Sequence, residues 1–141
     1  GYVFQKEKFV WRKNIFKYIK KYNDNNYFVI IITNQSGIGR GFYKESDVKK
    51  LHKWMVNKIR SKGANIDKIY YASYFKDSKI YKYRSKKNLR KPSIGMIQEA
   101  KKDFSIKMNQ SILIGDSEID KQTAINAKIK FRILNFKSKL I

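Results

Sequence analysis

Residues 27–41 read YFVIIITNQSGIGRG and carry the strongest fold signal in the chain. The first seven side chains of this stretch are all aromatic or β-branched, which is typical of a strand buried on both faces of a sheet. The remaining residues, 34–41, are polar or glycine apart from Ile38. Because glycine lets backbone N–H groups approach a ligand closely, we expect an anion-binding loop at the end of this strand.

Strands and helices alternate along the rest of the chain. Apolar residues at helical spacing and short β-branched runs predict helices over residues 13–23, 45–62, 119–127 and from just after Pro92 to Phe104, and strands over residues 69–74, 111–115 and 131–134. The Lys-rich residues 75–91 are expected to form an exposed loop. This order predicts an α/β fold with one Rossmann-like parallel sheet and helices on both faces, in a single domain over residues 1–141.

Composition excludes several classes of protein. The chain has 141 residues and a formal net charge of +22, from 33 basic and 11 acidic residues. Cysteine is absent and His52 is the single histidine, which excludes a disulfide scaffold, a Cys-based zinc site and a cluster of His ligands. No apolar run reaches the roughly 20 residues that span a bilayer. We therefore expect a soluble, cytoplasmic, monomeric protein with no membrane partner.

The positive charge favours an anionic partner, either a phosphorylated small molecule or nucleic acid. Lysine supplies 27 of the 33 basic residues, however, and compositional drift on a solvated surface also produces such a bias. Arginine is the more selective signal, because its planar group binds an anion through two hydrogen bonds. Arg40, Arg84 and Arg90 all fall in expected loops, where a ligand could reach them.

Polar residues follow the expected strands, and the carboxyl ends of parallel strands meet at one edge of a sheet. Thr33 and Ser36 supply hydroxyl groups after the first strand, with Arg40 close behind them in the chain. This loop lacks the G-x-x-x-x-G-K-[ST] and G-x-G-x-x-G patterns of nucleotide-binding loops. It is therefore either a phosphate-binding loop of another kind or a glycine-rich connector.

Two pairs of charged residues belong to the same predicted site. Arg90 and Lys91 place two cations just ahead of a helix N-terminus, where an anion is favoured. Asp116 ends a strand and Asp120 follows four residues later, and carboxylates beside cations and a phosphate loop predict a Mg²⁺ site. The structural alternatives are a solvated cation pair and an acid at a helix N-terminus.

The order of these motifs resembles that of haloacid dehalogenase (HAD) phosphatases, in particular the D-glycero-D-manno-heptose 1,7-bisphosphate phosphatase and histidinol-phosphatase branch. The matching stretches cover nearly the whole chain: GYV at 1–3 with Phe9, TNQSGIGRG at 33–41, LHKWM at 51–55, IYY at 69–71, RKP at 90–92, GMI at 95–97, and IGD at 114–116 with Asp120. The resemblance implies hydrolysis of a phosphomonoester with Mg²⁺ through an aspartyl-phosphate intermediate.

Site roles follow from the same resemblance. It implies that Thr33 holds the transferring phosphoryl group and that Lys91 balances the charge of the nucleophile and of that group. It also implies that Asp116 is a Mg²⁺ ligand and that Asp120 supports the metal site. It assigns substrate contacts to Asn34, Gln35, Ser36 and Arg90, to which the composition of the loop adds Arg40. The expected substrate is a sugar phosphate, most specifically heptose 1,7-bisphosphate on a route to lipopolysaccharide or capsule sugars.

One departure from the family pattern concerns the nucleophile. The family uses a D-x-D pair at the end of a first strand, and no D-x-D occurs in the 141 residues. We therefore expect an N-terminally truncated chain, whose sheet has an unfilled slot flanked by apolar strands and which alone is inactive and poorly stable. A pseudoenzyme is the alternative.

A second departure concerns zinc. Many relatives in this branch carry a Cys/His zinc clip around the loop before the RKP motif, but the matching residues 72–75 (ASYF) and 87–89 (KNL) contain no zinc ligand. We expect Mg²⁺ but no zinc, and a loop that is ordered in another way. The segment between the missing D-x-D motif and Thr33 is too short for a large cap domain, so the site should be fairly open.

Other functions remain open at this point. Histidinol phosphate and a polynucleotide 3′-phosphate are the alternative substrates, and a non-catalytic nucleic-acid-binding or scaffold module is the alternative of another class. Nucleic acid is the less favoured partner, because the chain has no recognised nucleic-acid-binding motif and most aromatic residues fall at periodic, buried positions.

Overall fold

The structure, a computed structural model, describes residues 14–134, so GYV at 1–3 and Phe9 lie outside the described residues. The helices are α1 (Ile15–Asp24), α2 (Ser36–Arg40), α3 (Glu45–Ser61), α4 (Tyr81–Arg84), α5 (Gly95–Phe104) and α6 (Glu118–Ala127). The strands are β1 (Ile30–Asn34), β2 (Lys68–Ala72), β3 (Ile112–Gly115) and β4 (Lys130–Ile133), and the short 3₁₀ turns are η2 (Lys87–Leu89) and η3 (Met108–Gln110).

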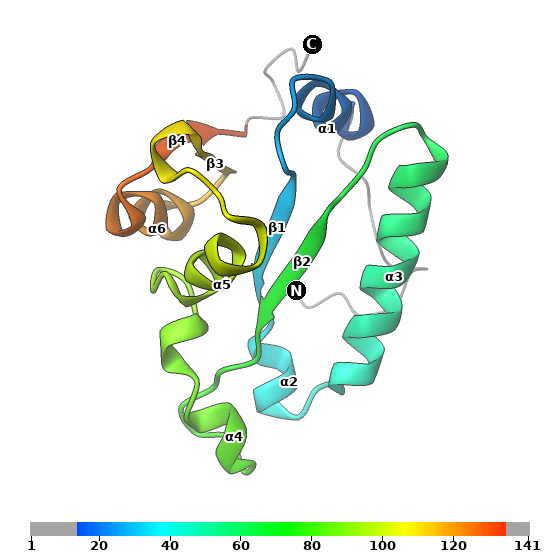
Figure 1. The fold of residues 1–141 in the computed structure, drawn as a ribbon. Coiled ribbons are helices and arrows are strands. Elements are labelled where there is room, and N and C mark those ends of the chain that lie inside the picture. The colour runs from blue at the N-terminus through cyan, green and yellow to red at the C-terminus, as the bar shows by residue number, and fades with distance from the viewer. Residues whose placement is uncertain (1–13, 135–141) are drawn as a thin grey trace.

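Strands β1 and β2 form a parallel pair with helices on both faces (Figure 1). Ile31 of β1 lies in one apolar cluster with Ile19 of α1 and Ile59 of α3. Ile30 and Ile32 lie in a different cluster, to which α5 contributes. Successive side chains of a strand point to opposite faces, so the unbroken apolar run at residues 27–33 serves two layers of helices. The predicted α/β class and the buried strand are confirmed.

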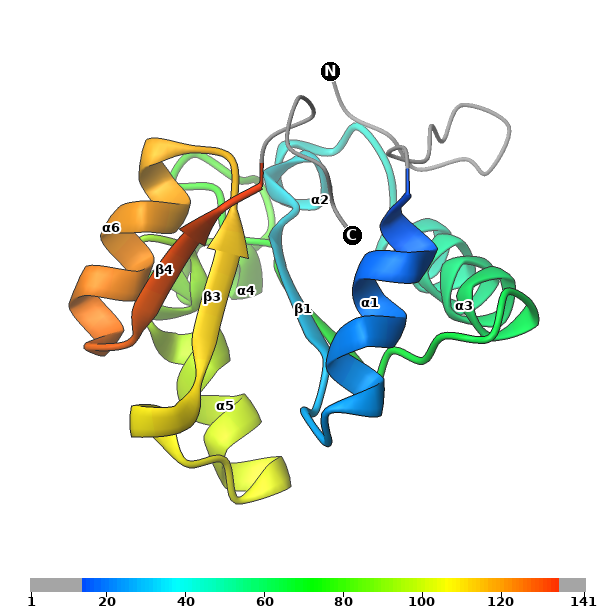
Figure 2. The same cartoon turned by 90° about the horizontal axis from the view of Figure 1, so that it is seen from above.

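Strands β3 and β4 form a second parallel pair, in which Leu113 lies opposite Phe131. Helix α6 packs against both strands and completely buries Thr123 and Ala124. Figure 2 shows β4, β3 and β1 following one another across the molecule, with the second pair and α6 on one side of β1 and the helices α1 and α3 on the other.

The two strand pairs do not join into one sheet in the part of the chain that the structure describes. Within residues 14–134, β1 pairs only with β2, and β3 pairs only with β4. A groove of about 1000 Å³ lies between them, and Ile30–Ile32 and Ile112–Ile114 contribute to its lining. The single parallel sheet of the sequence prediction is therefore replaced by two pairs in the described part of the chain. This groove lies between apolar strands, where the sequence predicted a slot, and the missing first strand itself stays a prediction.

The two loops predicted for residues 34–41 and 75–91 are partly wrong, because both contain helical turns. In α2 the glycines serve close packing: a Cβ on Gly37 would lie 2.3 Å from the ring of Tyr43, and one on Gly39 would lie 2.5 Å from the carbonyl oxygen of Ser73. In the second segment, α4 buries Tyr83 to 7% exposure. The lysines of this segment predicted an exposed loop, but burial of the Tyr83 side chain favours a helical turn there.

No helix described between residues 14 and 134 is long and apolar enough to cross a membrane. The longest of them, α3, has 17 residues, and charged residues are spread along it.

Candidate active site

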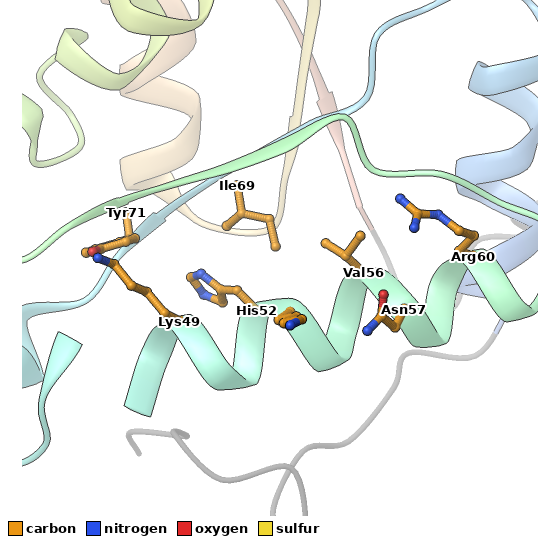
Figure 3. Close-up of a pocket in the computed structure, with 8 residues that line it drawn as sticks. Lys49, His52, Val56, Asn57, Arg60, Ile69 and Tyr71 are labelled. Carbon is orange, nitrogen blue, oxygen red and sulfur yellow. The ribbon is translucent and has the colours of Figure 1, made fainter. Parts of the chain in front are cut away.

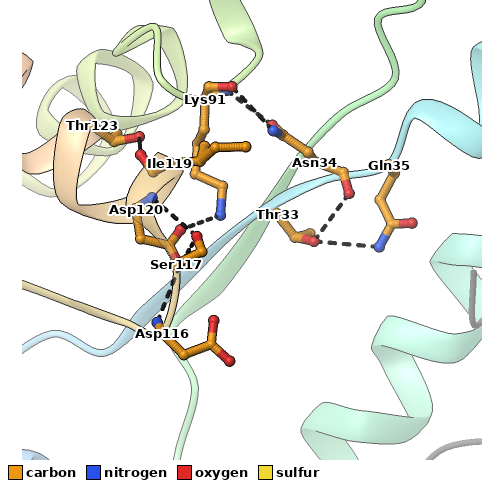
Figure 4. Close-up of polar contacts among 9 residues, drawn as sticks. All are labelled: Thr33, Asn34, Gln35, Lys91, Asp116, Ser117, Ile119, Asp120 and Thr123. Atoms are coloured by element: carbon orange, nitrogen blue, oxygen red, sulfur yellow. Dashed lines mark hydrogen bonds and ion pairs between the residues drawn. The ribbon is translucent and has the colours of Figure 1, made fainter. Parts of the chain in front are cut away.

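Part of the predicted site lies where β1, β3 and the segment before α5 come together (Figure 4), namely Thr33, Asn34, Gln35, Lys91, Asp116 and Asp120. Thr33 and Asn34 end β1, Asp116 follows β3, and Lys91 lies between η2 and α5. Lys91 and Asp116 both line one end of the groove between the strand pairs. The structure therefore brings together the trio Thr33, Lys91 and Asp116, although their chemical roles stay predictions.

Lys91 and Asp120 form a largely buried ion pair. The ammonium nitrogen of Lys91 lies 2.7 Å from Oδ1 of Asp120, and the two side chains are 15% and 12% exposed. Burial by itself raises the pKa of Asp120, but the hydrogen bond and charge of Lys91, together with Ser117 and the Asp116 N–H, outweigh it and lower the pKa below the usual 3.8. Asp120 is therefore an ionised counterion of Lys91 at neutral pH.

The second oxygen of Asp120 is also engaged. Oδ2 accepts hydrogen bonds from Ser117 Oγ at 2.9 Å and from the Asp116 backbone N–H at 3.3 Å. Ser117 in turn caps α6, because its Oγ accepts from the Asp120 backbone N–H at 3.2 Å. A serine three residues before an acid at a helix start is a capping signal that could have been read from the sequence.

Asn34 binds the backbone of Lys91 rather than pointing its amide into open space. Its Nδ2 donates to the Lys91 carbonyl oxygen at 3.1 Å, and its Oδ1 accepts from the Lys91 backbone N–H at 2.9 Å. The two bonds tie the end of β1 to the main chain of Lys91. The substrate contact that we predicted for Asn34 stays a prediction, and no local sequence signal indicates its two bonds to the Lys91 backbone.

Gln35 links Thr33 to the core. Its Nε2 donates to Thr33 Oγ1 at 3.4 Å, and its Oε1 accepts from the hydroxyl of Tyr43 at 2.7 Å. The backbone N–H of Gln35 also donates to the Ala72 carbonyl oxygen of β2 at 2.7 Å. Gln35, which follows β1, is therefore held by Tyr43 and by β2 while it contacts Thr33, and Tyr43 is a contact that the sequence reasoning missed.

Ser36 and Arg40 lie on α2, next to this turn. Ser36 is buried, and its Oγ accepts a weak hydrogen bond of 3.4 Å from Arg40 Nε. The Arg40 guanidinium stacks 4.2 Å from the ring centre of Phe75, a second residue that the sequence reasoning missed. Arg90 is half-buried and adjoins Lys91, so its position in the chain brings it to the same edge.

The carboxylates fit magnesium better than zinc. Asp116 is exposed at the carboxyl end of β3 and offers hard oxygen ligands. Among residues 14–134 no group of three or more His, Asp or Glu side chains forms a metal cluster, and Mg²⁺ commonly takes only one or two protein carboxylates with water and phosphate oxygens. Both oxygens of Asp120 accept hydrogen bonds, and Asp120 is buried, whereas Asp116 is the more exposed of the two carboxylates. The metal roles of both residues and the absence of zinc stay predictions.

A second, smaller groove lies between α3 and β2 (Figure 3). It measures about 440 Å³, and its lining includes Lys49, His52 and Tyr71 but none of the predicted site residues. Burial lowers the pKa of His52 to about 4, so the imidazole is neutral at pH 7, and its ring packs edge-on to Tyr71 at 5.9 Å. These contacts give His52 a packing role between α3 and β2.

Comparison with known proteins connects this site to a family. The family model described as polynucleotide kinase 3 phosphatase matches residues 2–134. The chain is 38% identical over 134 residues to the D-glycero-alpha-D-manno-heptose-1,7-bisphosphate 7-phosphatase of Burkholderia mallei, covering 95% of this chain and 71% of that relative. It is 38% identical over 128 residues to the D-glycero-beta-D-manno-heptose-1,7-bisphosphate 7-phosphatase of Rhodopseudomonas palustris, covering 91% and 71% of the two chains.

Solved structures show the same fold. The D,D-heptose 1,7-bisphosphate phosphatase of B. bronchiseptica, complexed with magnesium and phosphate, superposes with a TM-score of 0.80 at 22% identity, over 92% of this chain and 69% of that one. A protein from Mesorhizobium loti described as a HAD-like phosphatase gives a TM-score of 0.82 at 26% identity, over 89% and 60% of the two chains. The chain therefore belongs to the polynucleotide kinase 3 phosphatase family and, within the haloacid dehalogenase superfamily of phosphatases, to the heptose-1,7-bisphosphate phosphatase branch.

Proposed function

We propose that this chain is the phosphate-binding part of a Mg²⁺-dependent phosphomonoesterase whose substrate is D-glycero-D-manno-heptose 1,7-bisphosphate. The observation that carries the proposal is that Thr33, Lys91 and Asp116 lie in one neighbourhood (Figure 4), where Lys91 and Asp116 also line the groove. The heptose bisphosphate relatives, which match over 91–95% of this chain, support the choice of sugar. Relatives named for the alpha and for the beta anomer match equally well at 38% identity, so the proposal covers both.

The residues of this chain supply charge and orientation. Phosphoryl transfer depends mainly on the positioning of the phosphate group and on the stabilisation of its negative charge. The ammonium group of Lys91 would bind a phosphate oxygen, and its low exposure strengthens that attraction. The Thr33 hydroxyl would donate to a second oxygen, while Arg40 and Arg90 would hold the rest of the substrate.

Magnesium fits the oxygen ligands at the carboxyl end of β3. Asp116 would hold the ion and Asp120 would support the metal site. Bound Mg²⁺ would neutralise negative charge on the phosphate oxygens. The aspartate nucleophile that the family resemblance implies has no counterpart in a D-x-D motif of these 141 residues. We therefore expect substrate binding by this chain alone, but no turnover.

A polynucleotide 3′-phosphate is the second candidate substrate. The description of the matching family model and the net charge of +22 both favour it. Histidinol phosphate and a non-catalytic scaffold stay alternatives without a structural feature that favours them. A cytoplasmic location and a monomeric state also stay predictions.

Calorimetric titration tests the proposal. We expect heptose 1,7-bisphosphate with Mg²⁺ to bind the wild-type chain, and Lys91→Ala to weaken binding about tenfold or more, since a charge-assisted hydrogen bond is lost. Lys101→Ala, on the exposed part of α5, is the matched control and should bind like the wild type. Equal affinity for Lys91→Ala and the wild type would contradict the assignment, and preferential binding of an oligonucleotide 3′-phosphate would favour the second candidate. Phosphate release above the Lys91→Ala background would refute the expected lack of turnover.

A further inference from the structure

A cluster of one carboxylate, two tyrosines and a lysine lies outside the site, where α3, β2 and α4 meet. Glu45 is in the first turn of α3, where the helix dipole favours an acid. Its Oε1 accepts from the Tyr71 hydroxyl of β2 at 2.7 Å, and its Oε2 accepts from the Tyr83 hydroxyl of α4 at 2.8 Å. Lys82 Nζ lies 3.3 Å from the same Oε2. One side chain thus joins three elements that are far apart in the sequence.

The protonation states suit this arrangement at neutral pH. Burial tends to raise the pKa of Glu45, but the hydrogen bonds from Tyr71, Tyr83 and Lys82 outweigh it and lower the pKa below 4.5. Burial and then the Glu45 carboxylate raise the pKa of both tyrosines above 10. The carboxylate is therefore the acceptor and both phenol groups are donors.

The cluster anchors a segment whose basic side chains repel one another. Residues 73–91 contain eight basic side chains and one acid, so their mutual repulsion opposes a compact shape. Tyr83 counters this by packing with Ile38 and Val48 in an apolar cluster, and it is 7% exposed. A buried tyrosine hydroxyl needs a hydrogen-bond partner, and Glu45 provides it.

The anchored segment contacts the site at two points. The Tyr83 carbonyl oxygen accepts a hydrogen bond from the Phe75 backbone N–H at 3.0 Å. The Arg40 guanidinium carbon lies over the Phe75 ring, 4.2 Å from its centre. Farther along, the same segment ends at Lys91, whose backbone is bound by Asn34. The position of Tyr83 therefore determines where Phe75, and with it Arg40, can lie.

We propose that Glu45 is a positioning residue: its carboxylate holds α4 through Tyr83 and so fixes the segment 73–91 in the shape that presents Arg40 and Lys91 to a bound anion. The nature of that anion rests on the proposed function, but the anchoring of the segment does not. No metal ligand is required for this order, since a carboxylate and two phenol groups supply the cross-links.

Hydrogen exchange on the full chain tests the anchoring. In Glu45→Gln and Tyr83→Phe we expect backbone amides of residues 75–90 to exchange about tenfold faster, while amides in the middle of α3 keep their protection. Tyr81→Phe is the matched control, because the Tyr81 side chain is 73% exposed and belongs to the same helix. Unchanged exchange in residues 75–90, or equally faster exchange throughout the chain, would overturn the proposal.

Affinity for inorganic phosphate in the presence of Mg²⁺ tests the effect on the site. We expect both variants to bind phosphate several-fold more weakly than the wild type and the Tyr81→Phe control. The double variant should bind no more weakly than either single one, because both changes break the same link. Faster local exchange with unchanged phosphate affinity would overturn the positioning role. If the wild type binds no phosphate, the proposed function fails and the positioning role with it, while the exchange result still decides whether Glu45 anchors the segment.

Discussion

The ammonium group of Lys91 reaches from the β1 side of the groove to Asp120 on the β3 side, over a nitrogen–oxygen distance of 2.7 Å. At its backbone, Lys91 is bound by the side-chain amide of Asn34 at the end of β1. Lys91 is thus bound both to the end of β1 and to α6, the helix that packs on β3 and β4, while the two strand pairs have no strand pairing with each other in the described part of the chain. The residue that we propose for phosphate binding therefore also joins Asn34 and Asp120.

Breaking this ion pair should therefore cost stability. Lys91→Met leaves the Asp120 carboxylate largely buried without its cation, and we expect a loss of about 2–4 kcal/mol in the free energy of unfolding. The double variant Lys91→Met/Asp120→Leu removes both charges and should recover part of that loss. Urea unfolding at pH 7 measures both changes. A double variant no more stable than Lys91→Met would show that the lost stability does not come from an unpaired Asp120 carboxylate.

Asn34 is expected to act through Lys91. Asn34→Leu keeps the size of the side chain but removes both bonds to the Lys91 backbone, so the ammonium group loses its fixed position. We expect affinity for inorganic phosphate, measured by calorimetry with Mg²⁺, to fall about tenfold.

The comparison variant for Asn34 is Asn126→Ala. The Asn126 side chain donates to the carbonyl oxygen of the neighbouring Pro92 at 3.0 Å, but it is exposed on α6. We expect phosphate affinity within twofold of the wild type for this variant. A similar loss in both variants would mean that any disturbance of the segment before α5 weakens binding.

Periodicity predicted the order of the secondary-structure elements because each element satisfies a local rule. The apolar run at 27–33 gave β1, and the apolar spacing over 45–62 gave α3, which is followed by Gly63 at a φ of +85°, a conformation that favours glycine. The residues that follow three predicted strands also met at one site, because parallel strands end on the same side.

The parts that could not be predicted depend on contacts between distant residues. The two bonds from Asn34 join positions that are 57 residues apart, and nothing near Asn34 in the sequence indicates them. Likewise, Tyr83 lies among lysines, and only its contact with Glu45, 38 residues away, and its place in an apolar cluster explain why α4 is ordered. The local composition of a segment predicts whether it tends to be exposed, but it does not predict which distant residues the segment contacts.

The groove between the strand pairs should bind a hydrophobic dye. Its lining includes apolar side chains from both β1 and β3, and such surfaces in a folded chain enhance the fluorescence of anilinonaphthalene sulfonate. Ile114→Asn, which places an amide in the lining, should reduce the emission severalfold. Ile125→Asn is the control, because Ile125 is 57% exposed on α6 and is not a lining residue. Equal emission from the two variants would place the dye elsewhere.

His52 should make stability depend on pH in a defined window. Its pKa is about 4 in the folded chain because burial disfavours the charged ring, whereas an unfolded histidine titrates near 6.5. Between these values the unfolded state binds a proton that the folded state does not, so the contribution of His52 to stability is complete above pH 6.5 and is lost as pH falls toward 4.

His52→Phe keeps an aromatic ring beside Tyr71 but cannot titrate. From pH 7 to pH 4.5 we expect the wild type to lose about 1–2 kcal/mol more unfolding free energy than this variant, a value reduced by the partial exposure of His52. The difference between the two urea-unfolding curves isolates His52 from the carboxylates that titrate in both proteins, and parallel pH profiles would show that the imidazole is solvated well enough to protonate without cost.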